Sequence, residues 1–241
     1  MTPLFPTAAG QPGPCFFGMV SLLVSACFCS LATGETAGPE KFSDEVEALA
    51  RRKTPAPGHV LLVGSSTLRM WESAAKDLAP RPVENRGFGG SETEDQLFYF
   101  DRLLGGLEPA MVVWYCGSND ISHRKPVGTI LARTREWLTQ FRTRHPAVPV
   151  LLVTVMRAPQ KKRENLLAAV DGVNEGYQEM VRDLPGVYGV DINPPLEVRP
   201  GEPREELYQS DGLHLNERGY AEMVKVLRPK IEALWPDGQR P

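Results

Sequence analysis

The stretch HVLLVGSSTLRMW, residues 59–71, decides the fold of this chain. Four apolar residues at 60–63 lead directly into Gly64 and two adjacent serines, and an apolar pattern with helical spacing follows them. A short apolar run without polar interruptions is typical of a strand that is buried on both faces, as in a parallel sheet. The stretch therefore predicts a buried strand over His59–Val63 that turns into a helix at the serines.

Four more apolar runs predict further strands of the same sheet. They lie at Val83–Arg86, Met111–Cys116, Val150–Val155 and Val187–Val190. The longer segments between them have the apolar spacing of helices, which are predicted at Glu92–Leu104, Val127–Phe141 and Glu164–Arg182. Strands that alternate with helices indicate an α/β fold with a parallel sheet and crossover helices.

Two further helices flank this alternating region. An amphipathic segment, Phe42–Arg52, is expected to pack on the outside of the sheet. The last helix is expected to begin after Asn216, a good N-cap residue, and to turn its apolar side inward. Pro229 lies inside that helix and is expected to kink or break it, because proline lacks the N–H that a helix interior needs.

Small and polar residues follow the ends of the first three predicted strands, at Gly64–Ser66, Gly87–Ser91 and Gly117–Asp120. Because ligands of open parallel sheets bind outside the carboxyl ends of the strands, these residues are candidates for a functional site. A serine there exposes its hydroxyl beside the positive end of the following helix, which suits a nucleophile. A simple helix N-cap is the commoner role of an isolated Gly-Ser-Ser, so the partners of the serine must decide.

The four histidines are the candidates for the base that would activate such a serine. His59 opens the first strand, at the wrong end, and His145 ends a helix ahead of a proline, so neither is expected to reach it. His123 follows the third strand and stays a minor candidate. His214 comes three residues after Asp211 and directly before the last helix, and a carboxylate at that spacing can hold the imidazole in the required tautomer.

The loops after the second and third strands suggest where a negative charge could be stabilised. In NRGFGGSE, residues 85–92, the glycines miss the dinucleotide-binding spacing and no Walker A lysine follows, which argues against a phosphate site. Close glycines instead free a backbone N–H to approach a ligand. In CGSND, residues 116–120, Asn119 either donates its side-chain amide to a developing oxyanion or forms an ordinary Asn-Asp turn.

Four short blocks occur in this order: VGSST (63–67), GFGGSE (87–92), GSND (117–120) and DGLH (211–214). With them the chain resembles the GDSL or SGNH hydrolases over His59–Leu234, and its first two blocks resemble the bacterial subgroup that reads Gly-Ser-Ser in place of Gly-Asp-Ser. The resemblance implies a flavodoxin-like, three-layer α/β/α sandwich with a five-stranded parallel sheet. The missing G-x-S-x-G motif argues against the ordinary α/β-hydrolase elbow.

The resemblance also implies a role for each site residue. Ser66 would be the nucleophile, and Asp211 and His214 would complete a catalytic triad with it. The backbone N–H groups of Ser66 and Gly90 and the side chain of Asn119 would form the oxyanion hole. Neither a cofactor nor a metal is required by this chemistry.

Several residues beside the motifs have two interpretations. Ser65 stands where most of the family has Asp and stays an alternative nucleophile, although the register favours Ser66 at the helix start. Arg69 either meets a carboxylate on the substrate or forms a structural ion pair, which we favour. Cys116 ends a buried strand and is interpreted as a core residue rather than a thiol nucleophile. Three apolar side chains either line the acyl or sugar side or pack in the core, the latter favoured for the tryptophan: Phe88, Trp71 and Leu213.

The predicted function is that of a serine esterase or acylhydrolase that cleaves carboxylic esters through an acyl-enzyme on Ser66. Two loops, Met156–Asn165 and Asn193–Arg204, are polar, basic or rich in proline, and neither supplies the long apolar lid expected of an enzyme that acts on lipid surfaces. This favours short acyl groups on a soluble alcohol or a glycan. An acyltransferase on the same scaffold and a catalytically inactive glycan-binding module are the alternatives.

Composition and charge fit a single globular domain. The 241 residues suffice for one domain with a substantial core, and 41% of them are hydrophobic and 24% charged. A net charge of −3 offers no basic surface to a phosphate backbone, so nucleic acid is not an expected partner. The expected partner is a small-molecule or glycan ester.

The amino-terminal residues predict export. An apolar run at 15–32 indicates a signal peptide or a lipoprotein leader over residues 1–34, although no basic residue precedes Lys41. Residues 24–27 resemble a lipobox, in which Cys27 would carry a lipid and attach the protein to a membrane. A linker and short helix are expected at 35–57, the hydrolase domain at 58–235 and a disordered tail at 236–241. The protein is therefore expected to be periplasmic, secreted or lipoprotein-anchored, and its one domain cysteine cannot form an internal disulfide.

Overall fold

A five-stranded sheet forms the centre of residues 38–235, the part of the chain that the computed structural model describes. The strands lie in the order β2-β1-β3-β4-β5, and every neighbouring pair is parallel. They are β1 (His59–Gly64), β2 (Val83–Asn85), β3 (Pro109–Tyr115), β4 (Val150–Val153) and β5 (Val187–Val190). The predicted α/β fold with a five-stranded parallel sheet is thus confirmed.

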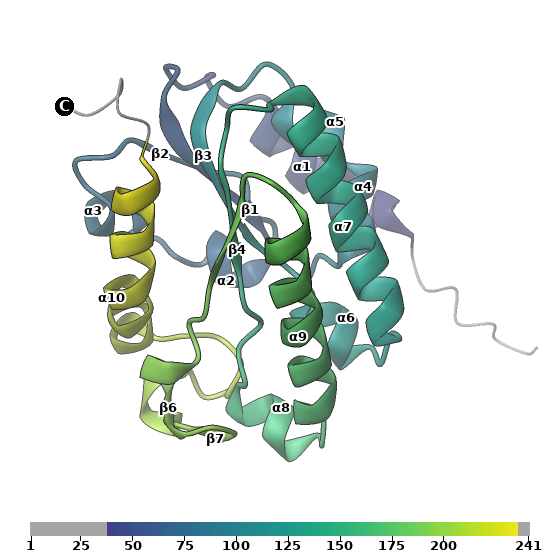
Figure 1. Ribbon diagram of the computed structural model, residues 1–241, viewed down its shortest axis with the longest axis vertical. Helices are drawn as coiled ribbons and strands as arrows, with labels where there is room; N and C mark the ends of the chain where they lie inside the picture. Colours follow the sequence, from purple (N-terminus) through teal and green to yellow (C-terminus); the bar gives the residue numbers. More distant parts are fainter. Residues whose placement is uncertain (1–37, 236–241) are drawn as a thin grey trace, which may run out of the picture. The chain divides into compact units, whose positions relative to one another are not determined.

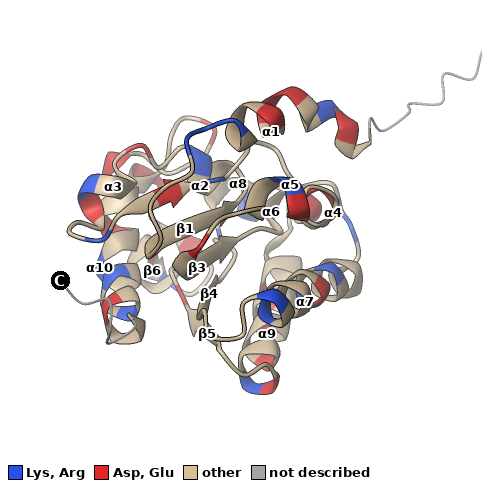
Figure 2. Cartoon of the chain, turned by 90° about the horizontal axis from the view of Figure 1, so that it is seen from above, with Lys and Arg blue, Asp and Glu red and all other residues tan. Residues whose placement is uncertain are grey.

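Helices cover both faces of the sheet, which gives three layers (Figure 1, Figure 2). One face is covered by α1 (Ser43–Ala50), α4 (Thr93–Phe98), α5 (Phe100–Leu104), α7 (Val127–Arg144) and α9 (Leu167–Asp183). The other face is covered by α2 (Ser66–Arg69), α3 (Ala74–Asp77) and α10 (Glu217–Leu234). Two short helices, α6 (Ser118–Ser122) and α8 (Pro159–Arg163), follow the carboxyl ends of β3 and β4.

The uninterrupted apolar run of β1 is explained by burial on both sides. Val60 and Leu62 point into the core beneath α10, whereas Leu61 and Val63 point into the core beneath α7 and α9. All six residues of β1 are buried. Because successive side chains of a strand point to opposite faces, a strand between two helical layers needs apolar residues at every position.

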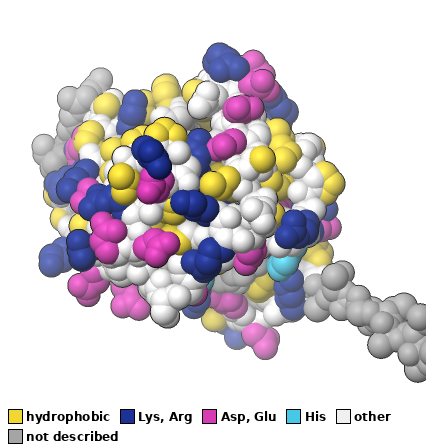
Figure 3. Space-filling view, turned by 90° about the horizontal axis from the view of Figure 1, so that it is seen from below, with side chains coloured by type: hydrophobic (Ala, Val, Ile, Leu, Met, Phe, Trp, Pro, Cys, Tyr) yellow, Lys and Arg dark blue, Asp and Glu magenta, His cyan; other side chains and the backbone are white. Residues whose placement is uncertain are grey.

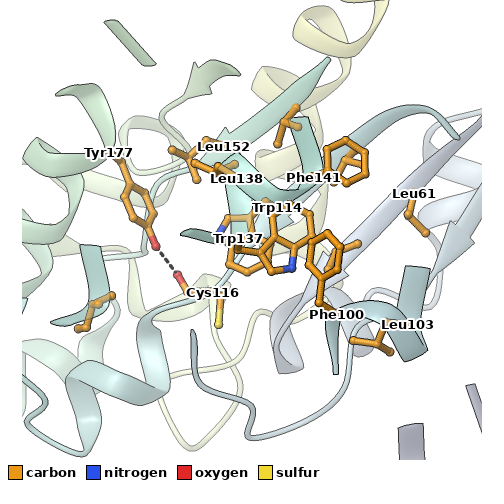
Figure 4. Packing of buried hydrophobic residues seen from close by; sticks show 14 of the residues in the cluster. Leu61, Phe100, Leu103, Trp114, Cys116, Trp137, Leu138, Phe141, Leu152 and Tyr177 are labelled. Atoms are coloured by element: carbon orange, nitrogen blue, oxygen red, sulfur yellow. Dashed lines mark hydrogen bonds between the residues drawn. The ribbon is translucent and has the colours of Figure 1, made fainter. Parts of the chain in front are cut away.

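The core between the sheet and α7 is built from stacked aromatic rings (Figure 4). The ring centroids of Trp114 on β3 and Trp137 on α7 lie 4.2 Å apart, and Phe141 stacks on Trp137 at 5.4 Å. Phe100 of α5 meets Trp137 edge-on at 5.4 Å. These contacts fix α5 and α7 against the central strand, which carries part of the functional site at its carboxyl end.

The predicted helix over Glu92–Leu104 is wrong in one respect, because the structure has two helices there. α4 ends at Phe98 and α5 begins at Phe100, and Tyr99 between them has ψ of 13°, outside the helical region. The Tyr99 hydroxyl donates to the Pro39 carbonyl oxygen at 3.0 Å and also bonds the Ser43 hydroxyl, so the break is fixed by packing against the residues before and in α1. No helix-breaking residue marks this point in the sequence.

The predicted helix over Glu164–Arg182 begins later than expected. α8 occupies Pro159–Arg163, inside a segment that we had interpreted as a loop, and α9 begins only at Leu167. Asn165 between them has φ of +57°, a left-handed conformation that ends a helix and that asparagine tolerates better than most residues.

β4 ends at Val153 and not at Val155 because a side chain replaces the sheet pairing. The Asn174 side-chain oxygen accepts from the Val155 N–H at 2.8 Å, and its amide donates to the Val155 carbonyl at 2.9 Å. These two bonds take both backbone groups of Val155 out of the ladder and attach the chain to α9.

The predicted break at Pro229 does not occur, since α10 continues through it to Leu234. Pro229 is exposed, so water can hydrate the carbonyl that loses its partner. Leu227 and Ile231, on either side of Pro229, are both buried against the sheet. Both halves of the helix therefore pack on the same core.

Regular structure also occurs between β5 and α10, where none was expected. A two-stranded antiparallel hairpin pairs β6 (Glu197–Arg199) with β7 (Glu202–Pro203). Short 3-10 helices at Pro39–Phe42, Pro194–Leu196 and Glu205–Leu207 complete the elements of residues 38–235.

The predicted leader at 1–34, the lipobox at Cys27 and the tail at 236–241 lie outside the described residues, so export stays a prediction. None of the helices within residues 38–235 is both long enough and apolar enough to span a bilayer.

Trp137→Ala should destabilise the protein by about 3–5 kcal/mol, because it removes a fully buried ring and leaves a cavity among three other aromatic side chains. Urea unfolding followed by circular dichroism measures this change. The matched control is Phe98→Ala, which truncates a side chain that is 56% exposed and should change the free energy of unfolding by less than about 1 kcal/mol. Equal effects of the two substitutions would contradict the assigned core.

Candidate active site

The residue at the centre of the site is Ser66, the first residue of α2. Ser65 before it is extended, with φ of −92° and ψ of −162°, and its N–H donates to the Tyr115 carbonyl at the end of β3 at 3.0 Å. The Ser65 carbonyl accepts from the N–H groups of Leu68 and Arg69, which closes the first turn. The N–H of Ser66 therefore has no acceptor within the helix, as expected of a first helical residue.

Hydrogen bonds connect three of the predicted site residues. The Ser66 hydroxyl Oγ lies 2.9 Å from His214 Nε2, although 148 positions separate the two residues in the chain. His214 Nδ1 lies 2.6 Å from Asp211 Oδ2. The arrangement is a hydroxyl, an imidazole and a carboxylate in line, and Ser66 rather than Ser65 occupies its hydroxyl position. Such a line can move a proton from the hydroxyl to the ring while the carboxylate stabilises the charged ring.

The turn that carries Asp211 holds its carboxylate in place. Asp211 Oδ1 accepts from the backbone N–H of Leu213 at 2.8 Å and of His214 at 3.0 Å, while Oδ2 is bonded to the ring. Burial raises the pKa of Asp211, but the hydrogen bonds from the His214 ring and from these N–H groups outweigh it and lower the pKa below its ordinary value. Asp211 therefore stays ionised at neutral pH.

The loop that contains Gly90 is tied to the end of β1. The Phe88 N–H donates to the Gly64 carbonyl at 3.0 Å, and the Gln96 side-chain amide bridges the same carbonyl and the Ser91 hydroxyl at 3.1 and 2.9 Å. Gly90 itself has φ of +74°, and a Cβ added there would meet nothing closer than the Phe42 ring at 3.9 Å. Glycine is needed here for the backbone conformation and not for lack of space.

The same loop contacts Asn119. Asn119 Nδ2 donates one hydrogen to the Ser91 carbonyl at 2.8 Å and has a second hydrogen for a ligand. Asn119 lies in the first turn of α6, which starts after Gly117 in a left-handed conformation with φ of +107°. The three loops after β1, β2 and β3 are thus joined by hydrogen bonds at the edge of the sheet where the carboxyl ends of the strands lie, as expected for loops that follow parallel strands.

A buried carboxylate that we did not single out in the sequence joins two of these loops. Asp120 is fully buried and accepts from the N–H of Thr93 at 3.1 Å and from its hydroxyl at 2.6 Å. Burial raises the pKa of Asp120 in spite of these bonds. Through these bonds Asp120 holds α6 against the start of α4. Its place directly after Asn119 in GSND is the one signal in the sequence that points to it.

The other three histidines lie elsewhere. His59 is buried at the start of β1 and its Nδ1 bonds the Ala56 carbonyl at 2.9 Å, and His145 follows the end of α7. His123, the minor candidate, is 62% exposed and its Nδ1 lies 2.5 Å from a carboxylate oxygen of Glu92. The structure records a hydrogen bond to the Ser66 hydroxyl from His214 and from none of these three within residues 38–235.

The side chains with two interpretations mostly belong to the core. Trp71 and Phe88 are buried, and the Trp71 ring stacks on Tyr220 at 6.1 Å. Cys116 is fully buried, and burial raises the pKa of its thiol well above the ordinary value, so it is a core residue as expected. Arg69 lies 4.0 Å from Glu45, in the structural ion pair that we favoured. Leu213 is partly buried against the core beneath α10.

Metal ligands do not gather anywhere in the part of the chain that the structure describes. No three His, Cys, Asp or Glu side chains within residues 38–235 lie close enough together to hold an ion.

Residues 57–222 match the model of the GDSL-like lipase/acylhydrolase family. No curated protein sequence matches the chain. The fold is similar to that of a GDSL-like lipase from Bacteroides thetaiotaomicron, with 18% identity and a TM-score of 0.66 over 81% of this chain and 98% of the other. It is also similar to a lipase/acylhydrolase from Enterococcus faecalis (22% identity, TM-score 0.59, 73% and 96% covered) and to a carbohydrate esterase family 3 protein from Talaromyces cellulolyticus (18%, 0.58, 73% and 97%).

His214→Ala should raise the pKa of Asp211, because it removes the ring hydrogen bond that helps to hold that pKa down. The carboxyl carbon signal of Asp211, followed by NMR from pH 7 to pH 2, reports the change. Glu222 is the control, since Lys225 lowers its pKa and both proteins should titrate alike there. In the wild-type protein the lowered pKa of Asp211 adds stability above the ordinary Asp range, which is lost as the pH falls through the lowered value. An unchanged Asp211 titration would contradict the bond.

Proposed function

Since this chain belongs to the GDSL-like lipase/acylhydrolase family and is a carboxylic ester hydrolase, we propose that it cleaves short acyl esters of a soluble alcohol or a glycan through an acyl-enzyme on Ser66. The observation that carries the mechanism is the 2.9 Å contact between the Ser66 hydroxyl and His214 Nε2. A general base must lie within hydrogen-bond reach of the proton that it removes, and this pair meets that condition before any substrate is bound.

The first half of the reaction makes the acyl-enzyme. His214 Nε2 takes the hydroxyl proton as Ser66 Oγ attacks the ester carbonyl carbon, and Asp211 stabilises the protonated ring through Nδ1. The tetrahedral intermediate then collapses, the bond to the alcohol oxygen breaks, and the ring gives its proton to that oxygen. In the second half, the oxygen of a water attacks the acyl carbon while the ring takes one of its protons, the bond between that carbon and Ser66 Oγ then breaks, the acid leaves, and the ring returns its proton to Oγ.

The negative oxygen of the intermediate needs donors that are already in place. We assign this role to the backbone N–H groups of Ser66 and Gly90 and to the Asn119 side-chain amide. The contacts of the Gly90 loop with β1, and of Asn119 with the Ser91 carbonyl, support the assignment, because they hold all three donors on loops that are bonded to one another. Each such donor is worth about 10²–10³ in kcat in enzymes where one has been removed.

The surroundings of the site favour a short acyl group on a polar alcohol. The two loops that lack a predicted apolar lid are occupied by α8 and by the β6–β7 hairpin, and Arg163 of α8 is exposed. A cavity of about 280 Å³ adjoins the turn that carries Asp211, and its lining includes Arg163, Glu205 and Gln209. Charges of both signs are mixed on the surface at this end of the sheet (Figure 3). Hydroxyl groups of a glycan can bond such side chains, and one of the proteins that share the fold is a carbohydrate esterase.

Ser66→Ala should lower the kcat for an aryl acetate by about 10⁴-fold or more, because the nucleophile is lost. His214→Ala should have an effect of similar size, since the hydroxyl is then left without its base. The matched control is Ser65→Ala, which removes the neighbouring hydroxyl and should keep most of the activity. A fluorophosphonate probe followed by peptide mapping should label Ser66 in the wild-type protein. Activity that survives in Ser66→Ala, with label on Ser65, would reject the assignment.

A panel of esters with acyl chains of increasing length tests the substrate class. kcat/KM should be highest for acetyl and butyryl esters and fall for decanoyl and palmitoyl esters, and acetylated oligosaccharides should be hydrolysed. The same assay with a soluble alcohol added separates hydrolase from acyltransferase, because a transferase passes the acyl group to the acceptor in preference to water. A rise in kcat/KM with acyl length, or activity only on micelles, would overturn the proposal of a short soluble ester.

A further inference from the structure

The side chain of Lys161 is completely buried, although lysine ranks among the residues that are least often buried. Its ammonium nitrogen donates to the Ser118 carbonyl at 2.8 Å and to the Ser122 hydroxyl, both on α6. No carboxylate within residues 38–235 is recorded in an ion pair with it. The hydrogen bonds of this ammonium thus go to neutral groups, and the negative charge of Glu164 nearby only partly offsets the lowering of its pKa by burial.

The helix that carries Lys161 contacts both halves of the site. At its start, the Gln160 N–H donates to the Gly212 carbonyl at 2.9 Å, and at its end Arg163 donates to the Asp211 carbonyl at 2.7 Å. The guanidinium of Arg163 also covers Gly212, where a Cβ would lie 2.6 Å from Nη1. α8 is thus bonded to the turn that carries the acid and base and, through Lys161, to the helix that carries Asn119.

The bond to the Ser118 carbonyl acts on Asn119 directly. The carbonyl of Ser118 and the N–H of Asn119 belong to one planar peptide group. A donor that holds this carbonyl therefore also holds the backbone N and Cα atoms of Asn119. On its other side the Asn119 amide is held by the Ser91 carbonyl. Both contacts thus restrain the direction of the second amide hydrogen.

We propose that Lys161 is a positioning residue, which holds the Ser118–Asn119 peptide through its ammonium group so that the Asn119 amide stays aimed at the oxyanion. This proposal rests on the oxyanion role that we assign to Asn119. Lys161 touches no reacting atom and acts through Asn119 alone.

The effects of replacing the buried Lys161 on stability and on kcat separate this positioning role from a purely structural one. Burial lowers the pKa of Lys161 to about 8, so the side chain is mostly protonated at neutral pH at a cost in folding free energy. Lys161→Met removes the cost of burying the charge but leaves the Ser118 carbonyl and the Ser122 hydroxyl without this donor, so its two effects on stability oppose each other. A purely structural lysine should change kcat to the same extent with or without Asn119, whereas a positioning lysine should change kcat only while Asn119 is present.

The test is a double-mutant cycle in kcat with Lys161→Met and Asn119→Ala, measured on the full chain with an aryl acetate. Lys161→Met should lower kcat by about tenfold to hundredfold, the range for losing hydrogen bonds from a charged group, with KM little changed. In the Asn119→Ala background the same substitution should change kcat by less than about twofold, since the group through which it acts is gone. The melting temperature of Lys161→Met should stay close to that of the wild-type protein, because the relieved charge burial and the lost hydrogen bonds oppose each other. Lys162→Met, the exposed neighbour on α8, is the matched control and should leave kcat unchanged.

Each other outcome has a defined meaning. If Asn119→Ala leaves kcat intact, the proposed oxyanion role is wrong. If Asn119→Ala lowers kcat but Lys161→Met does not, or if the two effects multiply, the inference about Lys161 alone is overturned. Should Lys161→Met fail to fold, Ser122→Ala removes one acceptor of the ammonium and should lower kcat by about twofold to tenfold, the range for one hydrogen bond, only while Asn119 is present. An unchanged kcat in Ser122→Ala would then reject the proposal.

Discussion

The close approach of β1 and β3 at their carboxyl ends is the constraint on which the site depends. At Gly64 the backbone has φ of +151°, and a Cβ there would lie 1.9 Å from the Tyr115 carbonyl oxygen, so only glycine lets the two strands stay paired to this point. The next residue donates its N–H to that same carbonyl, and the helix with Ser66 begins at once. The Gly64 carbonyl in turn accepts from the loop that contains Gly90. The positions of Ser66 and of the Gly90 loop are therefore set by a single pair of adjacent parallel strands.

His214 reaches Ser66 from a segment that lies 148 positions further along the chain. α10 packs its buried residues against the face of the sheet that also carries α2, and the Tyr220 hydroxyl donates to the Thr67 carbonyl at 2.8 Å. This bond joins the first turn of α2, which contains Ser66, to the first turn of α10, which follows His214. The turn before α10 then needs only its own hydrogen bonds, from Asp211 to the N–H groups of Leu213 and His214, to present the imidazole. Packing of the apolar faces supplies the long-range order, and local polar contacts supply the final orientation.

Polar residues inside the domain concentrate at this end of the sheet, and each joins two segments of the site. Asp120 holds the start of α4, Gln96 bridges β1 and the Gly90 loop, and Lys161 joins α8 to α6. A buried polar group is costly unless its hydrogen bonds are made, so such groups fix one arrangement of loops where apolar contacts would tolerate several. The apolar layers on either side of the sheet act mainly to hold the strands and helices together.

The sequence by itself determined the order of strands and helices along the chain and the burial of β1 on both faces, because these depend on the local spacing of apolar residues. The candidate site residues came from the resemblance carried by four short blocks, and the positions of the histidines relative to the strands favoured His214 while His123 stayed a minor candidate. Tertiary structure alone decided the break at Tyr99, the end of β4 at Val153, the continuity of α10 through Pro229 and the burial of Lys161. Each of these depends on contacts with residues far away in the chain, which the spacing of neighbouring residues does not encode.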